Sequence, residues 1–151
     1  MSGIFMPVWC KGAETENSPF KPSKGGPSHV TLCYSGGEVK VPELVTIASN
    51  VLAEWATKTI TIDRVKVNTF TPKGEPERHD VWMIVCDKDA KALQKTRETY
   101  MSSLFSNDKV FMRDFHITSK IHTTWEAADA HAKAIFNALP LEVEIIGVTI
   151  D

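Results

Sequence analysis

Hydrophobic and polar positions in the first half of the chain predict three strands and one helix. Two short segments are apolar, β-branched or aromatic over the length of a strand. Between the second and third strands, apolar residues recur at the spacing of a one-faced helix. The third strand alternates with a period of two and slips in phase near Asp63 and Arg64. The predicted elements are strands at 4–9 and 29–35, a helix at 42–58 and a strand at 60–70.

The second half repeats a similar order of strands and helices. Asp87 or Asp89 suits the start of a helix, because its carboxylate accepts hydrogen bonds from the free N–H groups of the first turn. Thr123 and Glu126 have the spacing of a capping box for a later helix. The predicted elements are a strand at 81–86, a helix from Asp87 or Asp89 to residues 105–108, a strand at 115–122, a helix at 124–139 and a strand at 141–150.

This repeated order predicts one α+β domain made of two related halves. At 151 residues the chain has room for a single hydrophobic core, so the predicted domain spans 1–151. The order occurs only twice, which favours a bilobal, pseudo-twofold domain over a solenoid. The equivalent strands 29–35 and 115–122 are then expected to face each other across a cleft.

Composition and charge narrow the class of protein. Charged residues make up 24% and hydrophobic residues 42%, the usage of an ordinary globular protein. Lys and Arg number 17 and Asp and Glu 19, so the formal charge of −2 lacks the basic excess of a protein that wraps duplex nucleic acid. The three cysteines lack C-x-x-C spacing and indicate free thiols. With no pattern of a signal peptide or membrane span, the expected location is the cytoplasm.

One short motif occurs twice, at the start of the second strand of each half. It reads HVTL at 29–32 and HITS at 116–119. Because alternate side chains of a strand share a face, the His and Thr of each motif point the same way and the residue between them enters the core. If the two strands face each other, one cleft holds His29, Thr31, His116 and Thr118.

These four side chains suit metal-free acid and base chemistry on a phosphodiester. A neutral imidazole takes a proton from water or a ribose hydroxyl, while a protonated imidazole donates one to the leaving oxygen. The threonine hydroxyls donate hydrogen bonds to phosphate oxygens, where charge develops in the transition state. The alternative is that each motif is an accident of strand composition, since Thr is common in strands. Two copies in equivalent positions favour the catalytic interpretation.

On these motifs the sequence resembles the 2H phosphoesterase superfamily, the LigT-like and cyclic phosphodiesterase proteins defined by two H-x-[ST]-x motifs. The resemblance covers the length and element order of the chain, and its specific identity lies in the motifs at 29–32 and 116–119. It implies two antiparallel sheets around a central groove, with the helices outside. It also implies cleavage of 2′,3′-cyclic phosphates, 2′,5′ linkages or cyclic oligonucleotides without metal or other cofactor. One departure is that 10–28 reads as a loop where many relatives have a helix.

The loop at 10–28 is the expected determinant of substrate choice, because it leads directly into His29. Trp9 and Phe20 flank it and are candidates to stack on a base. Its lysines, which include Lys21 and Lys24, suit the steering of a phosphate, although a solvated loop would look the same.

Continued alternation along the second motif strand adds further candidates. Lys120 and His122 are expected on the face of His116, where Lys120 would pair with a phosphate or only solubilise the surface. A metal site at His116 and His122 is disfavoured because no carboxylate or Cys at ligand spacing accompanies them. Cys33 is expected on the face of His29, with a small buried hydrophobe as the alternative role.

The leading hypothesis is a phosphodiesterase that acts on a nucleotide or oligonucleotide. One version opens 2′,3′-cyclic phosphates at RNA ends. Another degrades 2′,5′-linked or cyclic oligonucleotides, as the resemblance implies for viral LigT-like proteins that counter host nucleotide-based defence, which would place a viral protein in the host cytoplasm. A binding module that holds phosphate without turnover, and a structural partner protein, are the other classes. The sequence indicates no obligate protein partner, and it leaves open which histidine is the acid.

Overall fold

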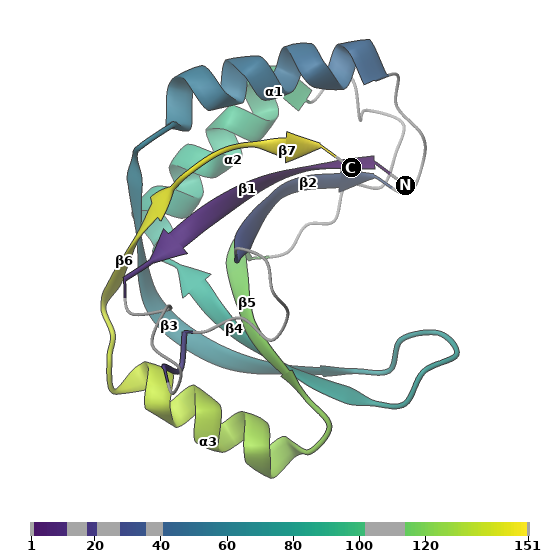
Figure 1. Cartoon of the computed structure of the whole chain (residues 1–151), viewed down its shortest axis with the longest axis vertical. Helices are drawn as coiled ribbons and strands as arrows, with labels where there is room; N and C mark the ends of the chain where they lie inside the picture. The colour runs from purple at the N-terminus through teal and green to yellow at the C-terminus, as the bar shows by residue number, and fades with distance from the viewer. Residues whose placement is uncertain (1, 12–17, 21–27, 36–40, 102–113, 151) are drawn as a thin grey trace.

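The structure is a computed structural model that describes residues 2–11, 18–20, 28–35, 41–101 and 114–150. Over these residues the chain forms seven strands and three helices, which confirms the α+β class (Figure 1). The strands are β1 (Ser2–Cys10), β2 (His29–Ser35), β3 (Thr59–Phe70), β4 (Arg78–Val85), β5 (His116–His122), β6 (Leu141–Ile145) and β7 (Thr149–Ile150). The helices are α1 (Val41–Trp55), α2 (Asp87–Met101) and α3 (Trp125–Phe136).

The described strands belong to one antiparallel sheet in the order β2-β5-β4-β3-β6-β1-β7. β1 also pairs with β2, so the hydrogen-bonded ladder runs from β2 round to β1 and returns to β2. The two separate sheets that were expected are not observed among the described strands, because strands of the two halves pair with each other. β3 of the first half pairs with β4 and β6 of the second half, while β6 pairs with β1, so each half supplies strands to the other.

The helices cover the outer side of the curved sheet. In Figure 1, α1 and α2 lie together at one end of the molecule and α3 lies at the other. Trp55 at the end of α1 donates a hydrogen bond from Nε1 to Thr96 Oγ1 of α2 at 2.8 Å, which ties these two helices. α3 packs against β3, β4 and β5. No helix in the described part of the chain is long and apolar enough to cross a membrane.

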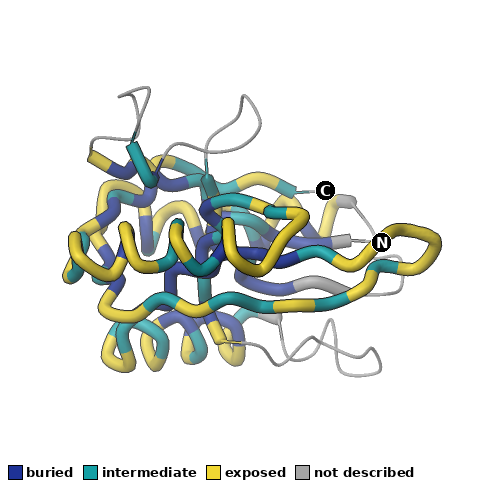
Figure 2. The backbone as a smooth tube through the Cα atoms, turned by 90° about the horizontal axis from the view of Figure 1, so that it is seen from below, coloured by how far each residue is buried: buried dark blue, intermediate teal, exposed yellow. Residues whose placement is uncertain are grey.

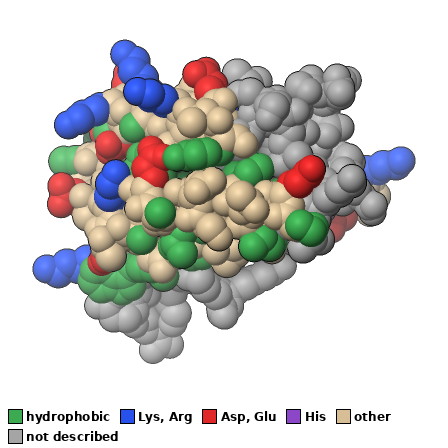
Figure 3. All heavy atoms as spheres, turned by 90° about the horizontal axis from the view of Figure 1, so that it is seen from above, with side chains coloured by type: hydrophobic (Ala, Val, Ile, Leu, Met, Phe, Trp, Pro, Cys, Tyr) green, Lys and Arg blue, Asp and Glu red, His purple; other side chains and the backbone are tan. Residues whose placement is uncertain are grey.

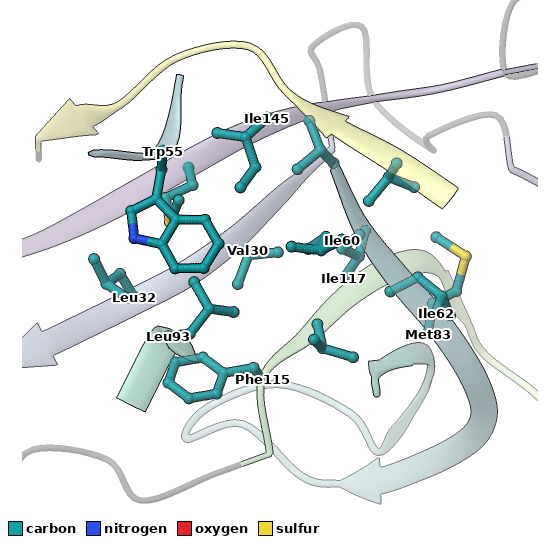
Figure 4. Close-up of a cluster of buried hydrophobic side chains, with 14 of the residues drawn as sticks. Val30, Leu32, Trp55, Ile60, Ile62, Met83, Leu93, Phe115, Ile117 and Ile145 are labelled. Atoms are coloured by element: carbon teal, nitrogen blue, oxygen red, sulfur yellow. The ribbon is translucent and has the colours of Figure 1, made fainter. Parts of the chain in front are cut away.

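A single hydrophobic core lies between the sheet and the helices. Val30 of β2 and Ile117 of β5 point into it and meet Leu93 of α2 and Ile145 of β6 there (Figure 4). Figure 2 shows the buried residues running through the interior, with exposed residues along the helices. Burial of each large aliphatic side chain contributes about 1.5–3 kcal/mol, so this core holds β2 and β5 in place.

Two helices end or begin at positions that differ from the predicted ones. α1 stops at Trp55 because Thr57 adopts a left-handed backbone conformation with φ of 66° and donates its N–H to the carbonyl of Ile145 at 3.0 Å. α3 begins one residue later than the capping box implies. Its N-cap is Thr124, whose Oγ1 accepts a hydrogen bond from the N–H of Ala127 at 3.3 Å.

The strand predictions hold for β3 and fall short for β4. The expected phase slip of β3 is confirmed as a register shift against β4 between Ile62 and Arg64. β4 begins at Arg78 rather than at the predicted position 81, because polar Arg78 and Asp80 continue the ladder opposite Phe70 and Asn68 of β3.

The observed cap makes a prediction about stability. Replacing Thr124 with Ala removes the side-chain acceptor at the start of α3, and we expect a loss of about 1 kcal/mol in the free energy of unfolding. Thr123→Ala is the matched control, since Thr123 is exposed and does not cap the helix. Chemical denaturation of both variants measures the difference, and a larger loss for Thr123→Ala would contradict this cap assignment.

Candidate active site

The register of β2 and β5 brings the four predicted residues to one face of the sheet. The two strands pair antiparallel, with Val30 opposite Ile117. Both side chains face the core, at 1% and 0% exposure. Neighbouring residues of a strand point to the other face, which here is the side away from the core. We call the four side chains on that face the quartet: His29, Thr31, His116 and Thr118.

The quartet forms a two-by-two block. Continued outward from the bridge, the register places His29 opposite Thr118 and Thr31 opposite His116. Opposite residues of an antiparallel pair have Cβ atoms about 4.5–5.5 Å apart, and diagonal residues about 7–8 Å apart. The histidines occupy one diagonal and the threonines the other. Imidazoles at this separation are placed to flank a group of the size of a phosphate.

The adjacent strands extend the block on both sides. β1 places Phe5 opposite Thr31 and Pro7 opposite His29. β4 places Ile84 opposite His116 and Trp82 opposite Thr118. His29 is exposed and the other three quartet residues are half-buried, so the block is open to solvent but bordered by apolar and aromatic side chains.

His116 is held by a ring and by a carbonyl. Its imidazole stacks on the Trp82 indole with ring centroids 3.7 Å apart and planes 13° from parallel. Its Nδ1 lies 2.7 Å from the backbone oxygen of Asp114. A carbonyl only accepts, so Nδ1 carries the hydrogen of this bond. This hydrogen bond fixes the orientation of the ring and places a hydrogen on Nδ1.

A lysine completes the surroundings of His116. Lys66 of β3 lies opposite Trp82, and its Nζ is 5.2 Å from the centre of the indole. The same Nζ is 3.2 Å from the Asp114 carboxylate. Asp114 thus holds His116 through its backbone and Lys66 through its side chain.

His29 has a different environment. The Phe5 ring meets it edge to face, with centroids 5.4 Å apart and planes at 81°. Desolvation lowers the pKa of the His29 imidazole from its ordinary value. No residue in the described part of the chain forms a hydrogen bond with this ring. Desolvation therefore favours the neutral form of His29, which is the form that accepts a proton.

A β-bulge changes the placement expected for Lys120 and His122. Trp82 pairs with Thr118, but Val81 pairs with Lys120, so Ser119 is an extra residue in β5. The alternation slips at this point, and Lys120 lies opposite a core residue rather than in line with His116 and Thr118. The expectation that Lys120 and His122 share the face of His116 is therefore not met.

His122 belongs to a histidine pair beneath α3. Its Nε2 is 3.0 Å from Nδ1 of His131, whose Nε2 in turn donates to the carbonyl of Pro19 at 2.7 Å. Ser119 Oγ donates to the same carbonyl at 2.8 Å. The pair holds residues 18–20 against α3 and β5. His131 was not among the predicted site residues, and its position in α3 carries no sequence signal of this contact.

The metal alternative gains no support from this arrangement. His116 and His122 lie on different faces of β5, with His122 bonded to His131. In the described part of the chain, no group of three or more His, Cys, Asp or Glu side chains is placed to hold a metal ion.

The candidates around the loop have different outcomes. Trp9 is 48% exposed and, like Phe5 and Pro7, lies on the side of β1 opposite its buried residues. Phe20 is 8% exposed and belongs to the core, so it is not available to stack on a base. Lys21 and Lys24 lie outside the described residues.

Cys33 was expected beside His29, but a bulge in β2 turns it inward. Phe5 pairs with Thr31 and Ile4 with Cys33, so Leu32 is an extra residue between them. Cys33 is 2% exposed, and burial raises the pKa of its thiol to about 11. The buried, hydrophobic role considered as the alternative is the observed one.

Trp82 and Asp114 are site residues that the sequence interpretation missed. Trp82 could have been found from the alternation of β4 once β4 was known to pair with β5. Asp114 acts through its backbone carbonyl, and that interaction leaves no mark on residue type.

Comparison with known proteins adds no family assignment. No family model matches the chain, and the search of curated proteins finds no significant relative. The face of the molecule seen in Figure 3 carries basic and acidic side chains side by side, without an extended basic surface among the described residues. Function is therefore inferred from the geometry of the quartet.

The histidine pair beneath α3 predicts a dependence of stability on pH. Desolvation lowers the pKa values of His122 and His131 in the folded state. The charge of Lys120 also lowers both, and the hydrogen bond to the Pro19 carbonyl offsets part of the effect at His131. The unfolded chain binds these protons near pH 6.5, so stability is full above that pH and falls as the pH drops below it.

Denaturation at pH 7.5 and 5.5 measures this loss. We expect His131→Gln to lose less free energy of unfolding between these two pH values than the unaltered protein. Lys133→Gln, on the same helix, should lose as much as the unaltered protein. An equal loss of stability in His131→Gln and in the unaltered protein would show that the pair does not carry it.

Proposed function

We propose that the protein is a metal-independent phosphodiesterase of the 2H type, acting on 2′,3′-cyclic phosphates, 2′,5′-linked or cyclic oligonucleotides. The observation that carries the proposal is the two-by-two block of His29, Thr31, His116 and Thr118 created by the Val30–Ile117 bridge. It offers two imidazoles and two hydroxyls to one phosphate, which is the set of groups that the chemistry requires.

The environments of the two histidines favour different roles. His29, whose lowered pKa favours the neutral form, is suited to take a proton from the attacking hydroxyl or water. As that oxygen forms its bond to phosphorus, the opposite P–O bond breaks. His116 serves as the acid in its imidazolium form, which keeps the Nδ1 hydrogen on the Asp114 carbonyl and delivers the Nε2 proton to the leaving oxygen. Thr31 and Thr118 are suited to donate hydrogen bonds to the non-bridging oxygens.

The strand arrangement supports the resemblance beyond the motifs themselves. β2 lies between β1 and β5, and β5 lies between β2 and β4. Each motif strand therefore pairs on one side with a strand of its own half and on the other side with the second motif strand. In both motifs, the residue after the Thr is the extra residue of a bulge, Leu32 in one and Ser119 in the other. This correspondence is what a pseudo-twofold, bilobal relation between the halves requires.

A screen of substrates in the presence of a chelator tests the proposal. The purified chain is incubated with 2′,3′-cyclic mononucleotides, RNA bearing a terminal 2′,3′-cyclic phosphate, 2′,5′-oligoadenylate and cyclic dinucleotides, and products are separated by chromatography. We expect catalytic turnover of at least one class. Binding in the absence of turnover would instead indicate a module that recognises phosphate, and the enzyme assignment would fail.

Substitution of either quartet histidine is expected to remove activity. His29→Gln and His116→Gln should each lower kcat/KM by about a hundredfold or more, as for a positioned acid or base. His122→Gln is the matched control, because His122 lies beneath α3 and not on the quartet face. Initial rates with the best substrate measure the effect. If His122→Gln lost as much activity as the quartet variants at unchanged thermal stability, the assignment of the site would be wrong.

The lowered pKa of His29 predicts how kcat/KM falls on the acidic side of its pH profile. A base whose folded pKa is lowered stays neutral to lower pH, so kcat/KM should remain high until the pH falls below about 6.5. A profile of kcat/KM against pH between 4.5 and 8 measures this limb. An acidic limb centred above pH 7 would contradict the role of His29 as base.

A further inference from the structure

A pocket of about 410 Å³ lies at the end of the sheet where β5 begins. It is bordered by β3 and β4 on one side and by α2 on the other, and its charged lining residues are Arg64, Asp87, Lys91, Arg97 and Asp114. A volume of this size is within the range of small-molecule sites. None of these residues belongs to the quartet, so the pocket is a separate feature of the surface.

The pocket adjoins His116. Ile84, which lines it, lies directly opposite His116 in the β4–β5 ladder. Asp114, which also lines it, holds the His116 imidazole through its carbonyl. Ile84 and Asp114 therefore connect the pocket to the quartet at the start of β5.

Arg97 is a buried cation in the wall of this pocket. It is 8% exposed, and its guanidinium lies 4.7 Å from the centre of the Phe115 ring. It donates to the carbonyl of Leu32 at 3.4 Å and to the side-chain oxygen of Gln94. Both acceptors are uncharged, and the Glu98 carboxylate attracts Arg97 through its charge rather than through a hydrogen bond or ion pair. Burying a cation without a directly bonded anion is costly. A cation held in this way at the edge of a pocket is a favourable binding group for an anion.

The other charges of the pocket do not neutralise Arg97. Asp87 pairs with Arg64 at 3.0 Å, and Asp114 pairs with Lys66 at 3.2 Å. Within the described residues, no carboxylate lies within ion-pair distance of Arg97 or Lys91. Among the described residues, Arg97 and Lys91 are thus the pocket cations without an ion-paired carboxylate. A phosphate monoester carries about −1.5 to −2 charges at pH 7 and is the kind of anion that two such cations suit.

We propose that this pocket binds a second, terminal phosphate of the substrate, one nucleoside away from the phosphate at the quartet, through Arg97 and Lys91. The proposal rests on the proposed function for the position of the first phosphate. It assigns the protein a preference for nucleotides that carry a phosphate monoester in addition to the phosphodiester that is cleaved. The guanidinium is the main contact, because it offers several donors in a fixed plane, and Lys91 adds a point charge.

A matched pair of substrates tests this subsite. Adenosine 2′,3′-cyclic phosphate with and without a 5′-phosphate presents the same bond to the quartet and differs only in the second phosphate. We expect the 5′-phosphorylated nucleotide to have a kcat/KM and an affinity at least about tenfold higher, as for charge-assisted hydrogen bonds in a partly buried site. The affinity is measured by calorimetry, so that the comparison does not depend on turnover.

Variants of the pocket then locate the contact. Arg97→Gln should remove the preference and Lys91→Gln should reduce it several-fold, with the nucleotide lacking the 5′-phosphate bound and cleaved as before. Arg97→Lys should restore part of the preference. Lys95→Gln is the matched control, an exposed lysine of α2 that does not line the pocket. Lys91 is exposed, so its variant tests the pocket even if Arg97→Gln does not fold.

The outcomes separate the two proposals. Turnover of both nucleotides with equal kcat/KM and equal affinity would overturn the subsite and leave the proposed function standing. A preference that survives in both Arg97→Gln and Lys91→Gln would also overturn it, because the second phosphate would then bind elsewhere. Absence of turnover with any substrate would end the proposed function, while a tenfold affinity difference abolished by Lys91→Gln would still support an anion site in the pocket.

Discussion

The bridge between Val30 and Ile117 is the contact on which the candidate site depends. Through it, β2 of the first half and β5 of the second become neighbours in one sheet. Both residues are buried in the core, so their burial, worth about 1.5–3 kcal/mol for each side chain, fixes the register of the two strands. A slip of either strand by one residue would turn the side chains of that strand to the other face and would bury the histidine of its motif. The apolar residue inside each H-x-T motif thus determines where its polar residues lie.

The same register explains why two similar motifs have unequal surroundings. His29 lies beside Phe5 of β1, an apolar neighbour that leaves its ring without a hydrogen bond among the described residues. His116 lies beside Trp82 of β4 and is bound by the Asp114 carbonyl. Desolvation favours the neutral form of one imidazole, and the other is fixed in orientation by the hydrogen bond that its Nδ1 donates. A pair of groups with one acceptor and one oriented donor is what proton transfer across a phosphate needs.

The sequence predicted the features that depend on local pattern. The α+β class, the helical spacing of α1 and the phase slip near Arg64 each follow from residues close together in the chain. It did not predict the closure of the strands into one ladder, because the pairing of β3 with β6 joins residues far apart. The bulge at Ser119 was missed for the same reason, since an extra residue can be recognised only against the partner strand. Because the bulge was missed, the contact of His122 with His131 of α3 was missed as well. The N-cap of α3 is Thr124 and not the predicted Thr123. Because the two threonines are adjacent, residue type alone does not decide which of them caps the helix.

The proposed function requires that His29 and His116 contact the same phosphate. Nitrogen NMR of the imidazole rings while adenosine 2′-monophosphate is added tests this requirement, with His29→Gln and His116→Gln used to assign the signals. We expect the His29 and His116 signals to shift together with a single Kd, while those of His122 and His131 stay in place. Shifts in only one of the two quartet histidines, or two clearly different Kd values, would contradict it.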